Sequence, residues 1–254
     1  MNMPRVISQF VLALSLFFMN PANFISPANF ISPANAGEAA ERDIIGFSPG
    51  GRYFAFEQYG VQDGSGFPYA DIFIIDTSTD EWVGASPFRV LMEDERAKQK
   101  WARREVITKA GNLLKKLVIS QPGRLLASNP SAELSADPHR VAVNSSQIIN
   151  GKPISWTFTL EEKMLANAKC ATYTSQPIKG FRLKVQKEGS AAITLHEDAS
   201  IPKSRGCPLR YAISDVITHE PNGGARIFAV LVSVYAHGFE GADRRFLVIT
   251  KRFP

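Results

Sequence analysis

The sequence Ile-Phe-Ala-Val-Leu-Val-Ser-Val-Tyr at residues 227–235 is the strongest apolar run beyond the first 36 residues of the chain. Apolar and polar residues do not alternate in it, as they would in a strand with one face in water. Such a run is typical of a strand that is covered on both faces. The Asn-Gly-Gly sequence at 222–224 precedes it and favours a hairpin. The run therefore predicts the core strand of a β fold.

Shorter strand patterns lie on the N-terminal side of this run. Residues 154–160 and 181–185 alternate apolar with polar side chains, which predicts two half-buried strands. Residues 191–195 and 211–217 are further, shorter candidates. Most of the second half of the chain is therefore expected to form β-sheet.

The first part of the chain has the pattern of an antiparallel meander. Residues 44–56 read as strand, turn and strand, because Pro49 fixes one turn dihedral and the two glycines that follow tolerate positive φ. A strand is predicted at 71–76, then a turn-forming Thr-Ser-Thr-Asp cluster at 77–80, then a strand at 81–83.

One segment, residues 93–118, has helical periodicity. An apolar stripe of spacing 4, 4, 3 and 4 runs along it, formed by Ala102, Val106, Ala110, Leu113 and Leu117. Acidic residues at 93–95 and lysines at 115–116 suit the helix dipole. Residues 121–139 are rich in Pro, Ser, Asn and Ala and predict a long surface connection.

These patterns together predict one mainly β domain over residues 37–254. Its antiparallel sheets are expected in a propeller-like or sandwich arrangement, with one long α-helix inserted near 93–118. The composition is that of a globular protein, with 44% hydrophobic and 21% charged residues. A formal net charge of +5 serves solubility and does not indicate nucleic-acid binding.

The N-terminus has the features of a cleavable signal peptide over residues 1–36. A short basic start precedes an apolar run at 6–19, which is too short for a membrane span of about 20 residues. The sequence Ala34-Asn35-Ala36 matches the small-x-small cleavage pattern, so the expected mature start is Gly37. No transmembrane segment is predicted in the mature chain, and a periplasmic or secreted location follows.

Cys170 and Cys207 are the two cysteines of the chain. An even pair in an exported protein predicts a disulfide. The two cysteines lack the paired spacing of a zinc site, and the four histidines show no metal-ligand spacing around them. The sequence therefore predicts no metal and no cofactor.

Two resemblances to known families are visible. Phe-Ser-Pro-Gly-Gly-Arg-Tyr-Phe-Ala-Phe at 47–56 and Asp-Ile-Phe-Ile-Ile-Asp at 71–76 resemble one blade of the TolB-type β-propellers, with glycine where the blade pattern has Asp. Residues 60–69, 204–208 and 238–246 are similar to a bacterial family of predicted secreted proteins of unknown function. This second resemblance implies export and carries no activity.

Two glycine-containing loops are the candidate ligand surface. The end of the chain weakly repeats the strand–loop–strand pattern of residues 50–75, which implies two similar hairpins. Their loops carry carboxylates beside aromatic or basic side chains, an arrangement suited to sugars or peptides. A plain turn and a structural ion pair are the alternative interpretations. The candidate ligand-binding residues are Glu57, Tyr59, Asp63, Tyr69, Glu240, Asp243 and Arg244.

The leading functional hypothesis is a non-catalytic periplasmic or secreted protein that binds an unknown envelope protein or polymer. An alternative is a hydrolase of an envelope polymer that uses paired carboxylates, with Glu57 or Asp63 close to Glu240. No Gly-x-Ser-x-Gly sequence supports a serine nucleophile, and no catalytic residue is assigned. A structural factor without a small ligand is the third hypothesis.

Overall fold

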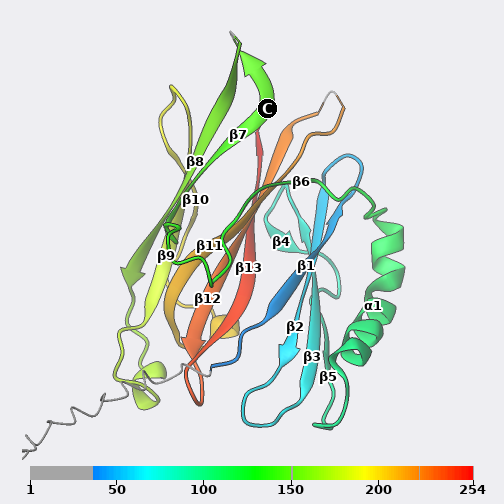
Figure 1. The fold of residues 1–254 in the computed structure, drawn as a ribbon, viewed down its shortest axis with the longest axis vertical. Helices are drawn as coiled ribbons and strands as arrows, with labels where there is room; N and C mark the ends of the chain where they lie inside the picture. The colour runs from blue at the N-terminus through cyan, green and yellow to red at the C-terminus, as the bar shows by residue number, and fades with distance from the viewer. Residues whose placement is uncertain (1–36, 150, 223, 254) are drawn as a thin grey trace, which may run out of the picture. The chain divides into compact units, whose positions relative to one another are not determined.

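The computed structural model describes residues 37–149, 151–222 and 224–253. The predicted signal peptide lies outside the described residues. The described chain forms three antiparallel sheets and one α-helix (Figure 1). We call the sheets the amino-terminal, middle and outer sheets.

The amino-terminal sheet is a meander of the first five strands. Its order is β1-β2-β3-β4, and β5 also pairs with β3. The strands are β1 (Glu41–Phe47), β2 (Tyr53–Val61), β3 (Pro68–Asp76), β4 (Glu81–Trp82) and β5 (Phe88–Leu91). The predicted turns after Phe47 and after Asp76 join these strands, so the expected meander is confirmed.

The other two sheets have four strands each. The middle sheet has the order β13-β12-β11-β6, with β6 (Arg124–Ser128), β11 (Pro208–His219), β12 (Arg226–His237) and β13 (Ala242–Phe253). The outer sheet has the order β10-β9-β8-β7, with β7 (Arg140–Ile149), β8 (Lys152–Met164), β9 (Lys179–Lys187) and β10 (Ile193–Glu197). Short 3-10 helices, η1 (Cys170–Thr172) and η2 (Lys203–Arg205), lie in the connections.

Strand β12 is buried on both faces because the middle sheet lies between the other two. Phe228, Val230 and Val232 pack with residues of β8 and β9 in one core. Ile227, Ala229 and Leu231 pack with aromatic residues of β2 and β3 in a second core. Because both faces of β12 are buried, its sequence does not alternate between apolar and polar residues. The predicted core strand is confirmed. The sheets stack face to face, which is the sandwich form of the expected fold.

The helix α1 (Gln99–Lys116) forms a fourth layer on the far face of the amino-terminal sheet (Figure 1). Its buried residues Ala102, Val106 and Ala110 pack on Ala55, Ala70 and other small or branched residues of β2 and β3. The apolar stripe therefore marks the buried face, as predicted.

Two details of the sequence prediction are corrected. The helix begins at Gln99, after the cap residue Lys98, and not near residue 93. The acidic residues form a separate turn, in which Asp94 Oδ1 accepts a hydrogen bond from the Arg96 N–H at 2.9 Å. The stretch 121–139 is not wholly a surface connection, because β6 pairs with β11 and extends the middle sheet.

The predicted disulfide between Cys170 and Cys207 is confirmed, with an S–S distance of 2.09 Å. It joins η1 to the residue that precedes β11. The bond therefore ties a connection of the outer sheet to the middle sheet.

Candidate functional site

The two glycine-containing loops lie at the same end of the molecule (Figure 1). They connect β2 to β3 and β12 to β13. The Glu240 N–H donates a hydrogen bond to Asp63 Oδ2 at 3.3 Å. A Cβ on Gly64 would lie 3.9 Å from the Phe239 ring, which is 84% exposed. Asp63 and Glu240, which the hydrolase hypothesis required to be close together, therefore meet at the loop tips, and their role as ligand-binding residues stays a prediction.

Glu57 and Tyr59 lie on the face of β2 that packs against α1. The Glu57 carboxylate is 3% exposed and accepts hydrogen bonds from Arg103 at 2.7, 3.1 and 3.2 Å. These bonds raise the pKa of Arg103. The same guanidinium lies 3.8 Å from the centroid of the Tyr59 ring and also pairs with Asp43. Glu57 and Tyr59 thus bind the helix to the sheet.

Tyr69, Asp243 and Arg244 lie near the first described residues of the chain. Tyr69 is buried, and this burial, together with the nearby Glu38 carboxylate, raises the pKa of its hydroxyl. Asp243 Oδ1 accepts a hydrogen bond from the Glu38 N–H at 3.0 Å. Arg244 donates to the Ala40 carbonyl at 2.8 Å and to Ser131 Oγ at 2.7 Å. The seven candidates therefore occupy three different environments.

A cavity that no sequence pattern indicated lies where the three sheets meet. It has a volume of about 510 Å³, within the range of about 300–1,000 Å³ usual for ligand sites. We call it the three-sheet cavity. Its principal lining residues are Asp71, Phe73, Asp80, Trp82, Arg89, His196, Ser204, Arg205, Arg245, Phe246 and Val248.

The amino-terminal sheet supplies one wall, which carries two half-buried carboxylates, Asp71 and Asp80. Burial raises the pKa of Asp71, although hydrogen bonding from Gln58 and the charge of Arg89, 4.0 Å away, lower it in part. Burial also raises the pKa of Asp80, which accepts hydrogen bonds from the N–H and hydroxyl of Thr250 at 2.7 and 2.8 Å. The Arg89 side chain is 58% exposed.

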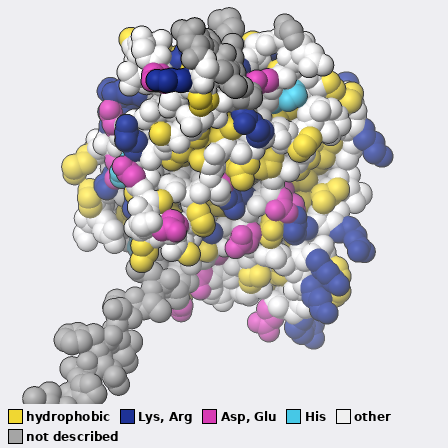
Figure 2. Space-filling view, turned by 45° about the horizontal axis from the view of Figure 1, so that its top comes forward, with side chains coloured by type: hydrophobic (Ala, Val, Ile, Leu, Met, Phe, Trp, Pro, Cys, Tyr) yellow, Lys and Arg dark blue, Asp and Glu magenta, His cyan; other side chains and the backbone are white. Residues whose placement is uncertain are grey.

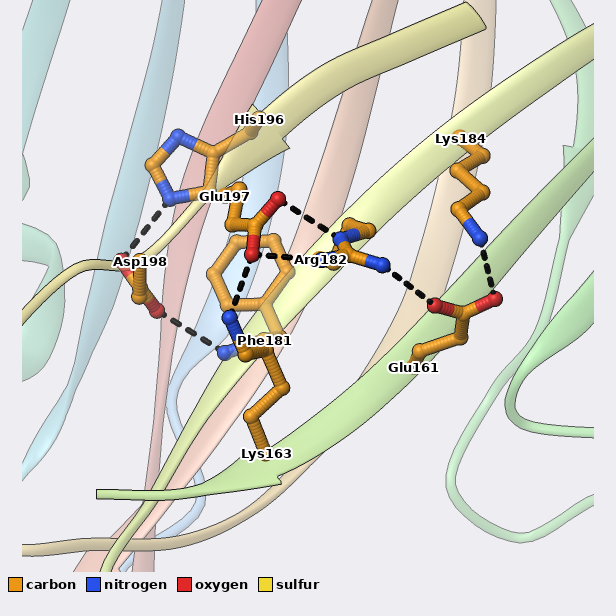
Figure 3. A network of polar contacts seen from close by, with 8 residues as sticks. All are labelled: Glu161, Lys163, Phe181, Arg182, Lys184, His196, Glu197 and Asp198. Atoms are coloured by element: carbon orange, nitrogen blue, oxygen red, sulfur yellow. Dashed lines mark hydrogen bonds and ion pairs between the residues drawn. The ribbon is translucent and has the colours of Figure 1, made fainter. Parts of the chain in front are cut away.

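The outer sheet and the connection after it supply the opposite wall. Asp198 joins the cavity residues His196 and Arg205, with distances of 2.9 Å to His196 Nε2 and 2.6 Å to Arg205 Nη1. Asp198 also accepts from the Phe181 N–H at 2.9 Å (Figure 3). Burial opposes ionisation, but these three hydrogen bonds lower the pKa of Asp198. The wall is therefore held rigidly by a buried ion pair.

Strand β13 forms the third side of the cavity through its open edge. The N–H groups of Phe246 and Thr250 point away from β12, since they donate to Gln58 Oε1 and Asp80 Oδ1. Backbone orientation repeats every two residues in an antiparallel strand, so the N–H and C=O of Val248 point the same way. Val248 lines the cavity. A ligand there meets a main-chain donor and acceptor beside aromatic and charged side chains.

The chemistry of the cavity suits binding. Among the described residues, no hydrogen bond joins the Ser204 hydroxyl to His196, and no group of three His, Cys, Asp or Glu could hold a metal ion. Arg205 and Arg245 are paired with Asp198 and Glu38 behind the lining. The cavity presents both charge signs because Asp71, Asp80 and Arg89 also line it. Aromatic walls with a few convergent polar groups are the common form of a small-molecule site.

Charged groups elsewhere on the described surface have a structural role. The outer face of the outer sheet carries alternating acidic and basic side chains, including Glu161, Arg182, Lys184 and Glu197 (Figure 3). Hydrogen bonds from Arg182 and Lys163 lower the pKa of Glu197 to about 2. Figure 2 shows both charge signs interspersed with hydrophobic side chains on one face of the molecule.

The fold and the cavity define a layered antiparallel β protein with a ligand-sized space between its sheets. The chain belongs to the family DUF2259, described as predicted secreted protein, whose model matches residues 55–252. The resemblance to a family of predicted secreted proteins is thereby confirmed, whereas the resemblance to a TolB blade stays a prediction. The chain matches no curated protein and no solved structure. None of the described helices is long and apolar enough to cross a membrane.

Proposed function

We propose that this chain is a non-catalytic periplasmic or secreted binding protein that holds a small ligand in the three-sheet cavity. The observation that carries the proposal is the meeting of the three sheets around a cavity of about 510 Å³ that is lined by both aromatic and charged groups. The proposed ligand has an apolar body and a charged group, since Trp82 and Phe73 lie in the same cavity as Arg89. An envelope component remains the proposed source of the ligand.

The positions of Glu57, Asp63 and Glu240 give the hydrolase alternative little support. Glu57 is buried on the helix side of β2, where its carboxylate forms an ion pair with Arg103. Asp63 and Glu240 meet on exposed loop tips and do not line the three-sheet cavity. A glycoside hydrolase needs two carboxyl groups at a defined separation on either side of the bond that is cleaved.

The test uses anilinonaphthalene sulfonate, an aromatic anion whose fluorescence rises in apolar sites. We expect saturable binding at one site, with energy transfer from Trp82. Trp82→Ala and Arg89→Ala should each weaken binding about tenfold, a loss of about 1.4 kcal/mol.

Two exposed residues outside the cavity give matched controls, Trp101→Ala on α1 and Arg96→Ala in the turn before it. We expect both controls to bind the probe as the unmodified protein does. Binding that does not saturate, or equal effects of cavity and control variants, contradicts the proposal.

A further inference from the structure

The first described residues of the chain lie along the open edge of β13. Ala39 forms a parallel bridge with Arg244, a residue 205 positions away in the sequence. The Arg244 N–H donates to the Glu38 carbonyl at 2.6 Å, and the Ala40 N–H donates to the Arg244 carbonyl at 3.1 Å. Glu38 and Ala40 are buried. Residues 38–40 are therefore held against the middle sheet by an isolated parallel bridge.

Gly37 fits closely against the chain at the start of β13. A Cβ at this position would lie 2.5 Å from the Ala242 carbonyl oxygen and 2.7 Å from its carbonyl carbon. Real Cβ atoms essentially never approach backbone so closely, so the contact requires glycine. The expected first residue of the mature chain, Gly37, thus lies in close contact with the backbone of Ala242.

Carboxylates gather around this contact. Asp243 Oδ1 already accepts the Glu38 N–H, and Asp63 lies near enough to act on Asp243. Burial raises the pKa of Asp243, and the charges of Glu38 and Asp63 raise it further, against the hydrogen bond from Glu38 and the charge of Arg245. Arg245 is itself paired with Glu38. An added positive charge here would stabilise the ionised form of Asp243.

We propose that the Ala242 backbone and the Asp243 carboxylate form a binding site for the α-ammonium group that signal peptidase creates at Gly37. We call these two residues the amino-terminal seat. Hydrolysis of the Ala36–Gly37 amide consumes one water and leaves a carboxylate on Ala36 and an amine on Gly37. This amine takes up a proton at neutral pH, since α-amino groups have a pKa of about 7.7–8.0.

The geometry puts the new charge beside Asp243. The Gly37 nitrogen is three covalent bonds from the Glu38 nitrogen, which lies 3.0 Å from Asp243 Oδ1. Before cleavage the Gly37 nitrogen is a neutral amide, so the ion pair exists only in the processed chain. Processing therefore strengthens the attachment of residues 37–40 to β13. The proposal rests on the predicted cleavage after Ala36 and is independent of a ligand in the cavity.

The test compares two disulfide-bonded chains, one that begins at Gly37 and one that begins at Asn35. We expect the Gly37 chain to have a Tm about 2–4 °C higher at pH 7. The difference should vanish at pH 10, where the amine is neutral, and in Asp243→Asn. Glu240→Gln removes a neighbouring carboxylate that is not in the seat, and it should retain the difference.

A second comparison does not depend on the folding of Asp243→Asn. The chain that begins at Gly37 is acetylated on its α-amine, which removes the charge and leaves Asp243 intact. We expect its Tm to equal that of the chain that begins at Asn35. Equal Tm values for the two unmodified chains at pH 7, or a difference that survives acetylation or pH 10, overturns the proposal.

Discussion

Replacing Arg103 by methionine tests whether Glu57 has a structural role. Arg103 is the group that holds the buried Glu57 carboxylate, which is 3% exposed. Methionine keeps much of the length and apolar packing of arginine but leaves this charge unpaired. Breaking a buried ion pair from one side costs about 3–5 kcal/mol. The half-exposed pair with Asp43 adds less than about 1 kcal/mol.

The assay is urea unfolding followed by far-UV circular dichroism, with the disulfide intact. With an m value of about 2.5 kcal/mol/M, a loss of 3–5 kcal/mol lowers the unfolding midpoint by about 1–2 M. Arg104→Met, on an exposed neighbour in the same helix, is the control and should change stability by less than about 0.5 kcal/mol.

The double variant Arg103→Met with Glu57→Gln separates the pair from its parts. Neutralising Glu57 removes the buried charge, so the double variant should recover about half of the loss or more. A loss under about 1 kcal/mol for Arg103→Met refutes the reasoning. Strict additivity of the two single substitutions refutes it as well, because it would mean that the side chains do not interact.

Three further predictions concern the disulfide, the helix and the buried Asp198. Replacing Cys170 and Cys207 by serine opens a loop of 37 residues separation and should cost about 4 kcal/mol in denaturant unfolding; a loss near zero would contradict the loop-entropy estimate. Lys98→Asp supplies the side-chain cap that the helix lacks and should raise stability by about 1 kcal/mol in the same assay; an unchanged midpoint would count against it. Because hydrogen bonds lower the pKa of Asp198 in the folded state, its stabilisation is present above about pH 4 and is lost as the pH falls further. Asp198→Asn should therefore destabilise the protein at pH 7 and much less at pH 2.5, and a pH-independent effect would refute this.

Local patterns predicted the elements wherever one element buries one recognisable face. The strand at 227–235 and the stripe of α1 were found because burial on two faces or on one stripe leaves a distinct period in the sequence. Strand β6 was missed because it is a short edge strand with half-exposed residues among turn-forming ones. The acidic turn before the helix was misplaced because carboxylates favour both first helical turns and turns outside a helix.

The candidate site was only partly predictable. The repeat of a strand–loop–strand pattern predicted two similar hairpins, but only the structure shows that Asp63 and Glu240 meet at their loops. The repeat could not show that Glu57 faces the helix. Alternation along β2 shows which residues share a face, but not which layer covers that face. The cavity residues Trp82, Arg89, His196 and Arg245 come from three sheets and share no spacing.

The sequence by itself determined the β character, the helix, the disulfide partners and the membership in a family of predicted secreted proteins, because periodicity, cysteine number and motif similarity are properties of the linear chain. Only the tertiary structure decided how the layers stack, where the three sheets enclose a cavity, and that residues 37–40 lie against β13. These features depend on contacts between residues as many as 205 positions apart, which no local pattern records.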